Sequence, residues 1–299
     1  MPEPAPNHPD ANDPNVFVFY RYDPSQVTAL ISMSFFLITT LFHTRQATTL
    51  RTVYFVPLIV GGCFEVVGYI ARSLAHSNRW SLGIYIMQEL LLLLAPALFA
   101  ASVYMTLGRM ILLTQGERLT PIPAKWLTKI FVCGDVLSFV VQSGGGLMAV
   151  PGMMAIGEHL VVLGLLIQII SFGIFIITAG IFHYRVVRSP TPASLQVNWR
   201  KYMYILYAVS ILIFIRSIFR VIEFSGGNDG FLMRSEVFVY VFEGLLMLCV
   251  MVSFNFIHPG KIISRRPLSQ IIIVMEGRDT TAGESKVSLS RSEEERTWI

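Results

Sequence analysis

Seven charged residues lie inside stretches of this sequence that are otherwise apolar. They are Glu65, Glu89, Asp135, Arg216, Arg220, Glu223 and Glu243. Gln88, Gln142 and Gln168 add uncharged polar groups to the same kind of stretch. Buried carboxylates and guanidinium groups either pair with each other or bind protons, ions and charged headgroups. Which of these two roles applies, mutual pairing or ligand binding, depends on the elements that carry the residues.

Composition places the chain in a membrane. Of its 299 residues, 54% are hydrophobic and only 14% are charged, and the mean hydropathy is +0.60. A soluble domain carries about 25% charged residues, so a multi-span membrane protein fits, and collagen-like and disordered classes are excluded. The three cysteines lie far apart inside apolar runs, which is neither a disulfide framework nor a metal-binding pattern. We expect buried thiols, no metal site and no cofactor.

Apolar stretches of about 20 residues, the length that crosses a bilayer, occur seven times. The predicted helices are 25–43, 53–73, 82–107, 127–148, 158–183, 202–223 and 236–257. Pro96 interrupts the third, which we predict to be one kinked helix in which a neighbouring group satisfies the carbonyl that the proline leaves free. The predicted fold is an all-α polytopic membrane protein. It has an N-terminal tail at 1–24, a seven-helix domain at 25–260 and a largely disordered tail at 261–299.

The distribution of Lys and Arg indicates the orientation. One side of the membrane receives the tail from Lys261 onward and Arg45, Arg51, Arg109, Arg118, Lys125, Lys129, Arg185, Arg188, Arg200 and Lys201. The other side receives Arg21, Arg72, Arg79 and Arg234. Because basic loops stay in the cytosol, we expect the N terminus outside and the C terminus in the cytosol. The net charge of +4 then reflects topology, with anionic inner-leaflet lipid rather than nucleic acid as the partner.

Residues spaced three or four apart share one face of a helix. One such face, in the second predicted span, consists of Gly61, Glu65, Gly68, Tyr69 and Arg72. Another, in the fourth span, consists of Asp135, Ser138, Gln142 and Gly145. A third, in the sixth span, consists of Arg216, Arg220 and Glu223. Small residues let helices approach while polar ones satisfy each other across the interface, so we expect these faces to point inward.

Depth in the bilayer sharpens this prediction. A charge at the bilayer centre costs about 2.5–3.5 kcal/mol unless it is paired, hydrated or near the interface. With a rise of about 1.5 Å per residue, most of the polar residues fall in the outer half of their spans. Glu65 and Arg216 lie near the middle and Asp135 on the inner side. We therefore predict a polar substrate cavity that opens toward the outer leaflet and is closed below by apolar packing. Its predicted residues are Glu65, Tyr69, Arg72, Gln88, Glu89, Asp135, Gln142, Arg216, Arg220, Glu223 and Glu243.

The same residues also have a purely structural interpretation. Ion pairs such as Arg220–Glu223 and Arg216–Glu243 would fix helix register and do nothing else. A cluster of this many acids and arginines exceeds what register requires, which favours a substrate or ion pathway. The glycines at 144–146 lack the Lys-Ser/Thr ending of a phosphate loop, so they indicate tight packing or local unwinding beside the cavity.

Arg72 has a separate interpretation, because it lies near the outer end of its span. A long basic side chain at that depth can extend to the interface while its stem stays in the apolar region. We expect Arg72 to snorkel in this way.

Several strings of the sequence, taken in order, resemble a known family. They are GGCFEVVGYIAR at 61–72, LLLAP at 92–96, AASVY at 100–104, FVCGDVLSF at 131–139, QSGGG at 142–146, RSIFRVIE at 216–223 and HPG at 258–260. These strings are similar to the fungal RTA-like family, the lipid-translocating exporters, over roughly residues 20–260. One departure precedes the last span, where many members have a His-Glu pair and this chain has Ser235-Glu236.

The resemblance implies a seven-helix fungal protein, most simply of the plasma membrane, that is not an enzyme. It would move lipid-like amphiphiles such as sphingoid long-chain bases, and contribute to efflux, lipid asymmetry and resistance to toxic amphiphiles. Some relatives are linked to porphyrin or haem handling. Carboxylates such as Glu65 and Glu243 would suit the amine of a sphingoid base, and the arginines would suit a phosphate or carboxylate.

A seven-helix receptor or sensor of lipids or stress is the main alternative, because it shares the expected topology. Against it, Gly108-Arg109-Met110 lacks the acidic-arginine signature of a third receptor helix, and the seventh span has no Asn-Pro-x-x-Tyr. That span also has no lysine for a retinal Schiff base. A lipid-modifying membrane enzyme is a third possibility, and the sequence shows no catalytic cluster for it. Oligomeric state, transport direction and energy source are left open.

Overall fold

The computed structural model describes residues 18–20, 22–150, 152–226, 230–232 and 235–260. Seven helices of this part of the chain are long and apolar enough to cross a membrane, and none of its residues is in a β-strand. The predicted all-α, seven-helix membrane fold is confirmed. The predicted tail at 261–299 and most of the one at 1–24 lie outside the described residues.

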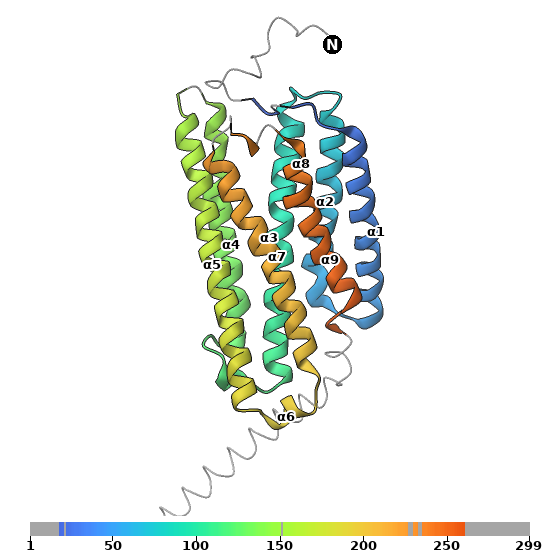
Figure 1. The fold of residues 1–299 in the computed structure, drawn as a ribbon, viewed down its shortest axis with the longest axis vertical. Coiled ribbons are helices and arrows are strands. Elements are labelled where there is room, and N and C mark those ends of the chain that lie inside the picture. The colour runs from blue at the N-terminus through green and yellow to red at the C-terminus, as the bar shows by residue number, and fades with distance from the viewer. Residues whose placement is uncertain (1–17, 21, 151, 227–229, 233–234, 261–299) are drawn as a thin grey trace, which may run out of the picture.

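The long helices run alternately up and down an elongated bundle (Figure 1). They are α1 (Gln26–Leu50), α2 (Val56–Ala75), α3 (Leu82–Leu113), α4 (Ala124–Gln142), α5 (Met154–Arg188), α7 (Trp199–Ser225) and the continuous span Glu236–Phe256, which ends in α9 (Leu246–Phe256). The shorter elements are η1 (Val53–Phe55), η2 (Glu117–Leu119), η3 (Ser143–Ala149), α6 (Pro192–Leu195), α8 (Glu236–Phe238) and η5 (Val239–Leu245). We call the end at which α1 begins the N-terminal end, and the end at which α9 stops the C-terminal end.

Two of the helices are longer than a bilayer requires. α3 has 32 residues and α5 has 35, which at about 1.5 Å per residue gives lengths of roughly 48 and 52 Å. The hydrocarbon core is about 30 Å thick. Both helices continue past the predicted ends at 107 and 183, so they carry Arg109, Arg185 and Arg188 beyond the apolar region at the C-terminal end.

α3 passes through Pro96 as a single helix, as predicted. Proline has no N–H, so the carbonyl four residues earlier, that of Leu92, loses its helical donor. Nη2 of Arg216 in α7 donates a hydrogen bond to this oxygen at 3.2 Å. A charged group of a neighbouring helix therefore satisfies the freed carbonyl, which is how a membrane helix tolerates an internal proline.

Glycines let α2 approach α3 closely. A Cβ on Gly61 would lie 2.7 Å from a ring carbon of Phe99 and 2.9 Å from the carbonyl oxygen of Ala95. A Cβ on Gly68 would lie 2.8 Å from a methyl carbon of Leu92. Both glycines are buried, as are the polar residues between and beside them on the same helix face. The prediction that this face points inward is confirmed.

The interior of the C-terminal half is aromatic. Tyr104 of α3 packs against Phe175 of α5 with ring centroids 4.7 Å apart, and Phe131 of α4 packs against Phe175 at 5.4 Å. Phe99 and Phe172 are also buried here. Contacts of this kind stabilise beyond the apolar area they bury. They close the bundle below the polar residues.

The outer surface of the bundle is apolar, as lipid requires. Isoleucines of α5 such as Ile170 and Ile177 are each 63% exposed. The cysteines do not follow the expectation of buried thiols, because Cys63 and Cys133 are exposed and Cys249 is half-buried. An apolar run in a membrane helix can face lipid as well as core, so apolar neighbours alone did not locate these thiols.

Candidate functional site

A polar pocket lies at the N-terminal end of the bundle. Its charged lining comes from five helical elements and consists of Arg72, Glu89, Glu158, Arg220, Glu223 and Glu243. Its other lining residues are Val18, Phe19, Tyr20, Tyr22, Tyr85, Gln88, Met148, Phe224 and Val239. The cavity volume is about 50 Å³, room for roughly three waters at about 15 Å³ each. The pocket can therefore hold a small headgroup, and a whole amphiphile would need the bundle to open.

Arg220 of α7 is the centre of the charge cluster in this pocket. Its Nη1 lies 2.9 Å from Oε2 of Glu223 and 3.8 Å from Oε2 of Glu243. Its Nη2 lies 3.4 Å from Oε2 of Glu89, whose side chain is 33% exposed. Nη2 of Arg216 pairs with Oε1 of Glu243 at 2.6 Å. The three carboxylates outnumber the two guanidinium groups, so the cluster favours an added cation.

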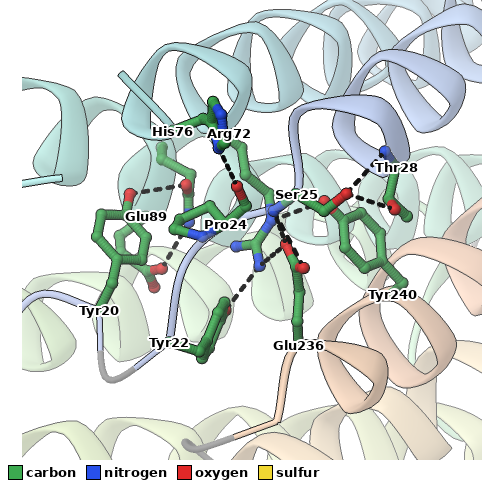
Figure 2. A network of polar contacts seen from close by, with 11 residues as sticks. Tyr20, Tyr22, Pro24, Ser25, Thr28, Arg72, His76, Glu89, Glu236 and Tyr240 are labelled. Carbon is green, nitrogen blue, oxygen red and sulfur yellow. Dashed lines mark hydrogen bonds and ion pairs between the residues drawn. The ribbon is translucent and has the colours of Figure 1, made fainter. Parts of the chain in front are cut away.

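The prediction that Arg72 snorkels to the interface is wrong, because its side chain is only 1% exposed. Its Nη2 donates to the hydroxyl of Tyr22 at 2.6 Å and pairs with Oε1 of Glu236 at 3.1 Å, and its Nε donates to the hydroxyl of Tyr240 at 3.0 Å. Figure 2 shows these partners around the guanidinium group. The segment before α1 and the helical span from Glu236 supply these three partners, which makes burial more favourable than exposure to the headgroup region.

The described residues just before α1 fold back over the pocket. The hydroxyl of Tyr20 donates to Oε1 of Gln88 at 2.8 Å. The backbone N–H of Ser25 donates to both carboxylate oxygens of Glu236, at 2.9 and 3.1 Å (Figure 2). Burial raises the pKa of Tyr22, so its hydroxyl stays neutral and can accept from a guanidinium group. Sequence reasoning missed Tyr20 and Tyr22, although the aromatic run before the first span was a usable signal.

Glu65 and Tyr69 do not line the pocket but lie on the same face of α2 below Arg72. Both are 0% exposed. Among the described residues, neither carboxylate oxygen of Glu65 nor the hydroxyl of Tyr69 has a hydrogen-bond partner. The Tyr69 ring stacks on Phe36 at 5.5 Å and on Tyr240 at 6.0 Å. These two predicted site residues form a buried layer beneath the charge cluster.

Asp135 and Gln142 belong to a different place, between α3, α4 and α5. The hydroxyl of Tyr104 donates to Oδ2 of Asp135 at 3.0 Å. Nε2 of Gln142 donates to Oε1 of Gln168 at 3.4 Å. Neither residue lines the pocket. The structure therefore brings six of the predicted residues to the pocket, places Glu65, Tyr69 and Arg216 directly beneath it, and leaves Asp135 and Gln142 elsewhere.

Two irregular helices shape the pocket. η5 is a π-helix that includes Glu243 and Gly244, and such widened turns recur at functional sites. A Cβ on Gly244 would collide with the Tyr69 hydroxyl, so only glycine allows this approach. η3 is a 3₁₀ helix that contains the predicted glycine run, and a Cβ on Gly144 would lie 2.6 Å from Leu160. Both features predicted for this glycine run, tight packing and local unwinding, are present in η3.

No group of three or more His, Cys, Asp or Glu residues is placed to hold a metal ion within the described ranges. The pocket lining supplies carboxylates, guanidinium groups and phenols.

Comparison with known proteins gives a consistent set of relatives. The family model described as "RTA1 like protein" matches residues 58–266. Protein RTM1 of Saccharomyces cerevisiae is 36% identical over 276 residues, which covers 79% of this chain and 89% of the relative. Protoporphyrin uptake protein 1 of the same species is 34% identical, over 80% of this chain and 91% of the relative. Sphingoid long-chain base transporter RSB1 is 27% identical, over 73% and 67%. No solved structure matches the chain.

Proposed function

The chain belongs to the RTA1-like family of multi-pass membrane proteins, and on that premise we propose that it moves lipid-like amphiphiles across the membrane without changing them chemically. Sphingoid long-chain bases and related toxic amphiphiles are the proposed substrates, and efflux, lipid asymmetry and stress or drug resistance the proposed outcomes. The observation that carries this is the buried charge cluster at one end of an apolar bundle. Intramembrane charges that face a cavity mark substrate or ion pathways.

The acid surplus of the cluster supports a substrate with a cationic headgroup. Glu89 is the most exposed carboxylate of the Arg220 cluster, and it shares Arg220 with Glu223. An amine that enters the pocket would meet Glu89 first and could replace part of its contact with Arg220 at 3.4 Å. The name of one relative, sphingoid long-chain base transporter RSB1, agrees with this choice.

A substrate with carboxylates is the natural comparison, because another relative is named as a protoporphyrin uptake protein. Arg72 already has three partners and Arg220 faces three acids. An anionic headgroup would have to displace those acids, which is why we favour the amine.

The proposed orientation places the pocket toward the outer leaflet of the plasma membrane. At the C-terminal end of the described chain the basic residues are all exposed, and they are Arg45, Arg51, Arg109, Arg118, Lys125, Lys129, Arg185, Arg188, Arg200 and Lys201. The positive-inside rule assigns that end to the cytosol, where anionic lipid would contact it.

The test is reconstitution of the purified protein in liposomes with fluorescent sphingoid-base, phospholipid and porphyrin probes. We expect flux of the sphingoid base and a loss of at least tenfold in Glu89→Gln. Glu117→Gln is the matched control, because Glu117 is an exposed acid at the C-terminal end. Flux of porphyrin alone would contradict the amine assignment. Absence of flux for every probe would overturn the transporter proposal and favour a receptor or sensor.

A further inference from the structure

A set of complementary polar atoms lies without partners beneath the pocket. The acceptors are both carboxylate oxygens of Glu65, and the hydroxyl of Tyr69 is beside them on the same helix face. The donors are Nε and Nη1 of Arg216. All three side chains are 0% exposed. Buried polar groups of native proteins nearly always have partners, so a cluster of unsatisfied ones in the described bundle calls for a ligand or a second arrangement.

The charges that act on Glu65 come from two elements. Glu243 of η5 and Arg216 of α7 interact with it electrostatically. α1 and α3 also pack against α2, and their described residues add no further charge to Glu65. Only Nη2 of Arg216 is paired with Glu243, at 2.6 Å, and within the described residues Glu65 forms no ion pair.

An isolated ionised carboxylate in such a place is strongly unfavourable, whereas a carboxylic acid is neutral and tolerable. A metal cation is a poor ligand here, because it needs about six oxygen ligands and would lie beside the guanidinium group of Arg216. The proton is the ligand that fits one carboxyl group with few neighbours.

We propose that Glu65 is a proton-binding site of the bundle, and that Arg216 takes up its carboxylate when the proton leaves. Nε and Nη1 of Arg216 are the unused donors that would do so. Binding Glu65 would draw Arg216 away from Glu243, which lines the pocket. Loss of the proton would thereby change the charge at the pocket floor.

The same helix face offers the proton a route. Glu65, Tyr69 and Arg72 lie on successive turns of α2 toward the N-terminal end, and Arg72 lines the pocket. The Tyr69 ring stacks on Tyr240, whose hydroxyl accepts from Nε of Arg72. A phenol between an acid and a polar pocket can pass a proton between them. Coupling of this proton to amphiphile movement rests on the proposed function, whereas the proton site itself does not.

Infrared difference spectroscopy of the full-length protein in lipid nanodiscs tests the site directly. We expect the wild type to show the carbonyl stretch of a protonated carboxylic acid. Glu65→Gln should remove a component of that band that Asp135→Asn leaves in place, since Asp135 is a buried acid that lies outside the pocket and pairs with Tyr104. An unchanged band in Glu65→Gln would overturn the proposal. Tyr69→Phe, which keeps the ring stacking, should shift the Glu65 component and provides a second reading if Glu65→Gln folds poorly.

A transport measurement then separates this proposal from the proposed function. In liposomes with a pH gradient, we expect sphingoid-base flux of the wild type to respond to the gradient at least fivefold, and Glu65→Gln to lose that response. If no probe moves in the wild type while the Glu65 band is present, the transporter proposal fails and the proton site stands. If flux responds equally to the gradient in both proteins, the coupling role of Glu65 is wrong.

Discussion

The arginines inside the N-terminal end of the bundle differ in exposure from those at its C-terminal end. At the N-terminal end, Arg72, Arg216 and Arg220 are at most 6% exposed and each has at least one acidic partner. At the C-terminal end, the basic residues of the described chain are exposed, and the interior is filled by aromatic rings such as Tyr104 and Phe175. The same residue type is therefore buried around a pocket at one end and exposed at the other.

The difference follows from what each arginine can reach. Arg72 is one helical turn from the end of α2 and could extend to water, yet three partners on other parts of the chain hold it inside. Arg188 is also at a helix end, but its hydroxyl partner Tyr184 is on its own exposed face at 2.9 Å. Exposure is thus decided by the partners available across the bundle, because a buried guanidinium is stable only when most of its donors are used.

The largest effect is expected from breaking the pair at the pocket floor. Arg216→Leu leaves Glu243 buried without its closest partner and Leu92 without its donor. We expect a loss of about 3–5 kcal/mol of unfolding free energy, measured by thermal unfolding in detergent. The double variant Arg216→Leu/Glu243→Leu should recover part of the loss, because it removes the unpaired charge. Equal stability of the single variant and the wild type would show that this pair is not structural.

A smaller effect is expected from the aromatic half. Tyr104→Phe removes the hydroxyl that donates to Asp135 at 3.0 Å, which should reduce stability by about 1–3 kcal/mol. Because Asp135 does not line the pocket, transport per folded molecule should not change. Adding Asp135→Leu to the same chain should restore stability. If Tyr104→Phe reduced flux at an equal amount of folded protein, the Tyr104–Asp135 contact would take part in transport.

The segment before α1 allows a matched comparison of the two ends. Tyr22→Phe removes a buried hydroxyl contact of Arg72, whereas Tyr184→Phe removes an exposed one of Arg188. We expect about 1 kcal/mol of local stability lost in the first case, seen as faster amide hydrogen exchange at 18–25, and no change in the second. Similar exchange in both variants would show that burial adds nothing to this contact.

The same contact has a pH signature. Because burial raises the pKa of Tyr22, its stabilising contribution is complete below the ordinary tyrosine value of about 10 and is lost as the pH rises through the folded value. Exchange at 18–25 should accordingly quicken at strongly alkaline pH in the wild type. In Tyr22→Phe this component of the change should be missing.

The length of the apolar stretches was sufficient to predict the seven spans, and helical periodicity was sufficient to predict the inward faces. The face with Glu65 and Tyr69 is buried, since a spacing of three or four residues fixes which side chains share a face. The free carbonyl before Pro96 was also predictable locally, because proline has no N–H, although its donor Arg216 was not.

Periodicity does not show which element packs against a given helix face. The Arg72–Glu236 pair joins residues 164 positions apart, and no local pattern specifies that contact. The π-helix around Glu243 depends on packing against Tyr69, which is equally non-local. Asp135 and Gln142 were assigned to the cavity from their face and depth, but their helix faces α3 and α5 rather than the pocket.

The smallest effect is expected at the basic end. Arg200→Gln and Lys201→Gln change exposed residues at the start of α7, so unfolding in detergent should change by less than about 0.5 kcal/mol. If these residues contact anionic lipid, each contributes about 1 kcal/mol at such a surface, and the double variant should lose part of the difference in stability between anionic and neutral nanodiscs. Arg72→Gln is the opposite case, because the partners of Arg72 are protein groups. The loss of stability in this variant should be the same in anionic and neutral nanodiscs. A lipid-dependent loss in Arg72→Gln would mean that this side chain reaches the headgroups, and would remove the contrast between the two ends.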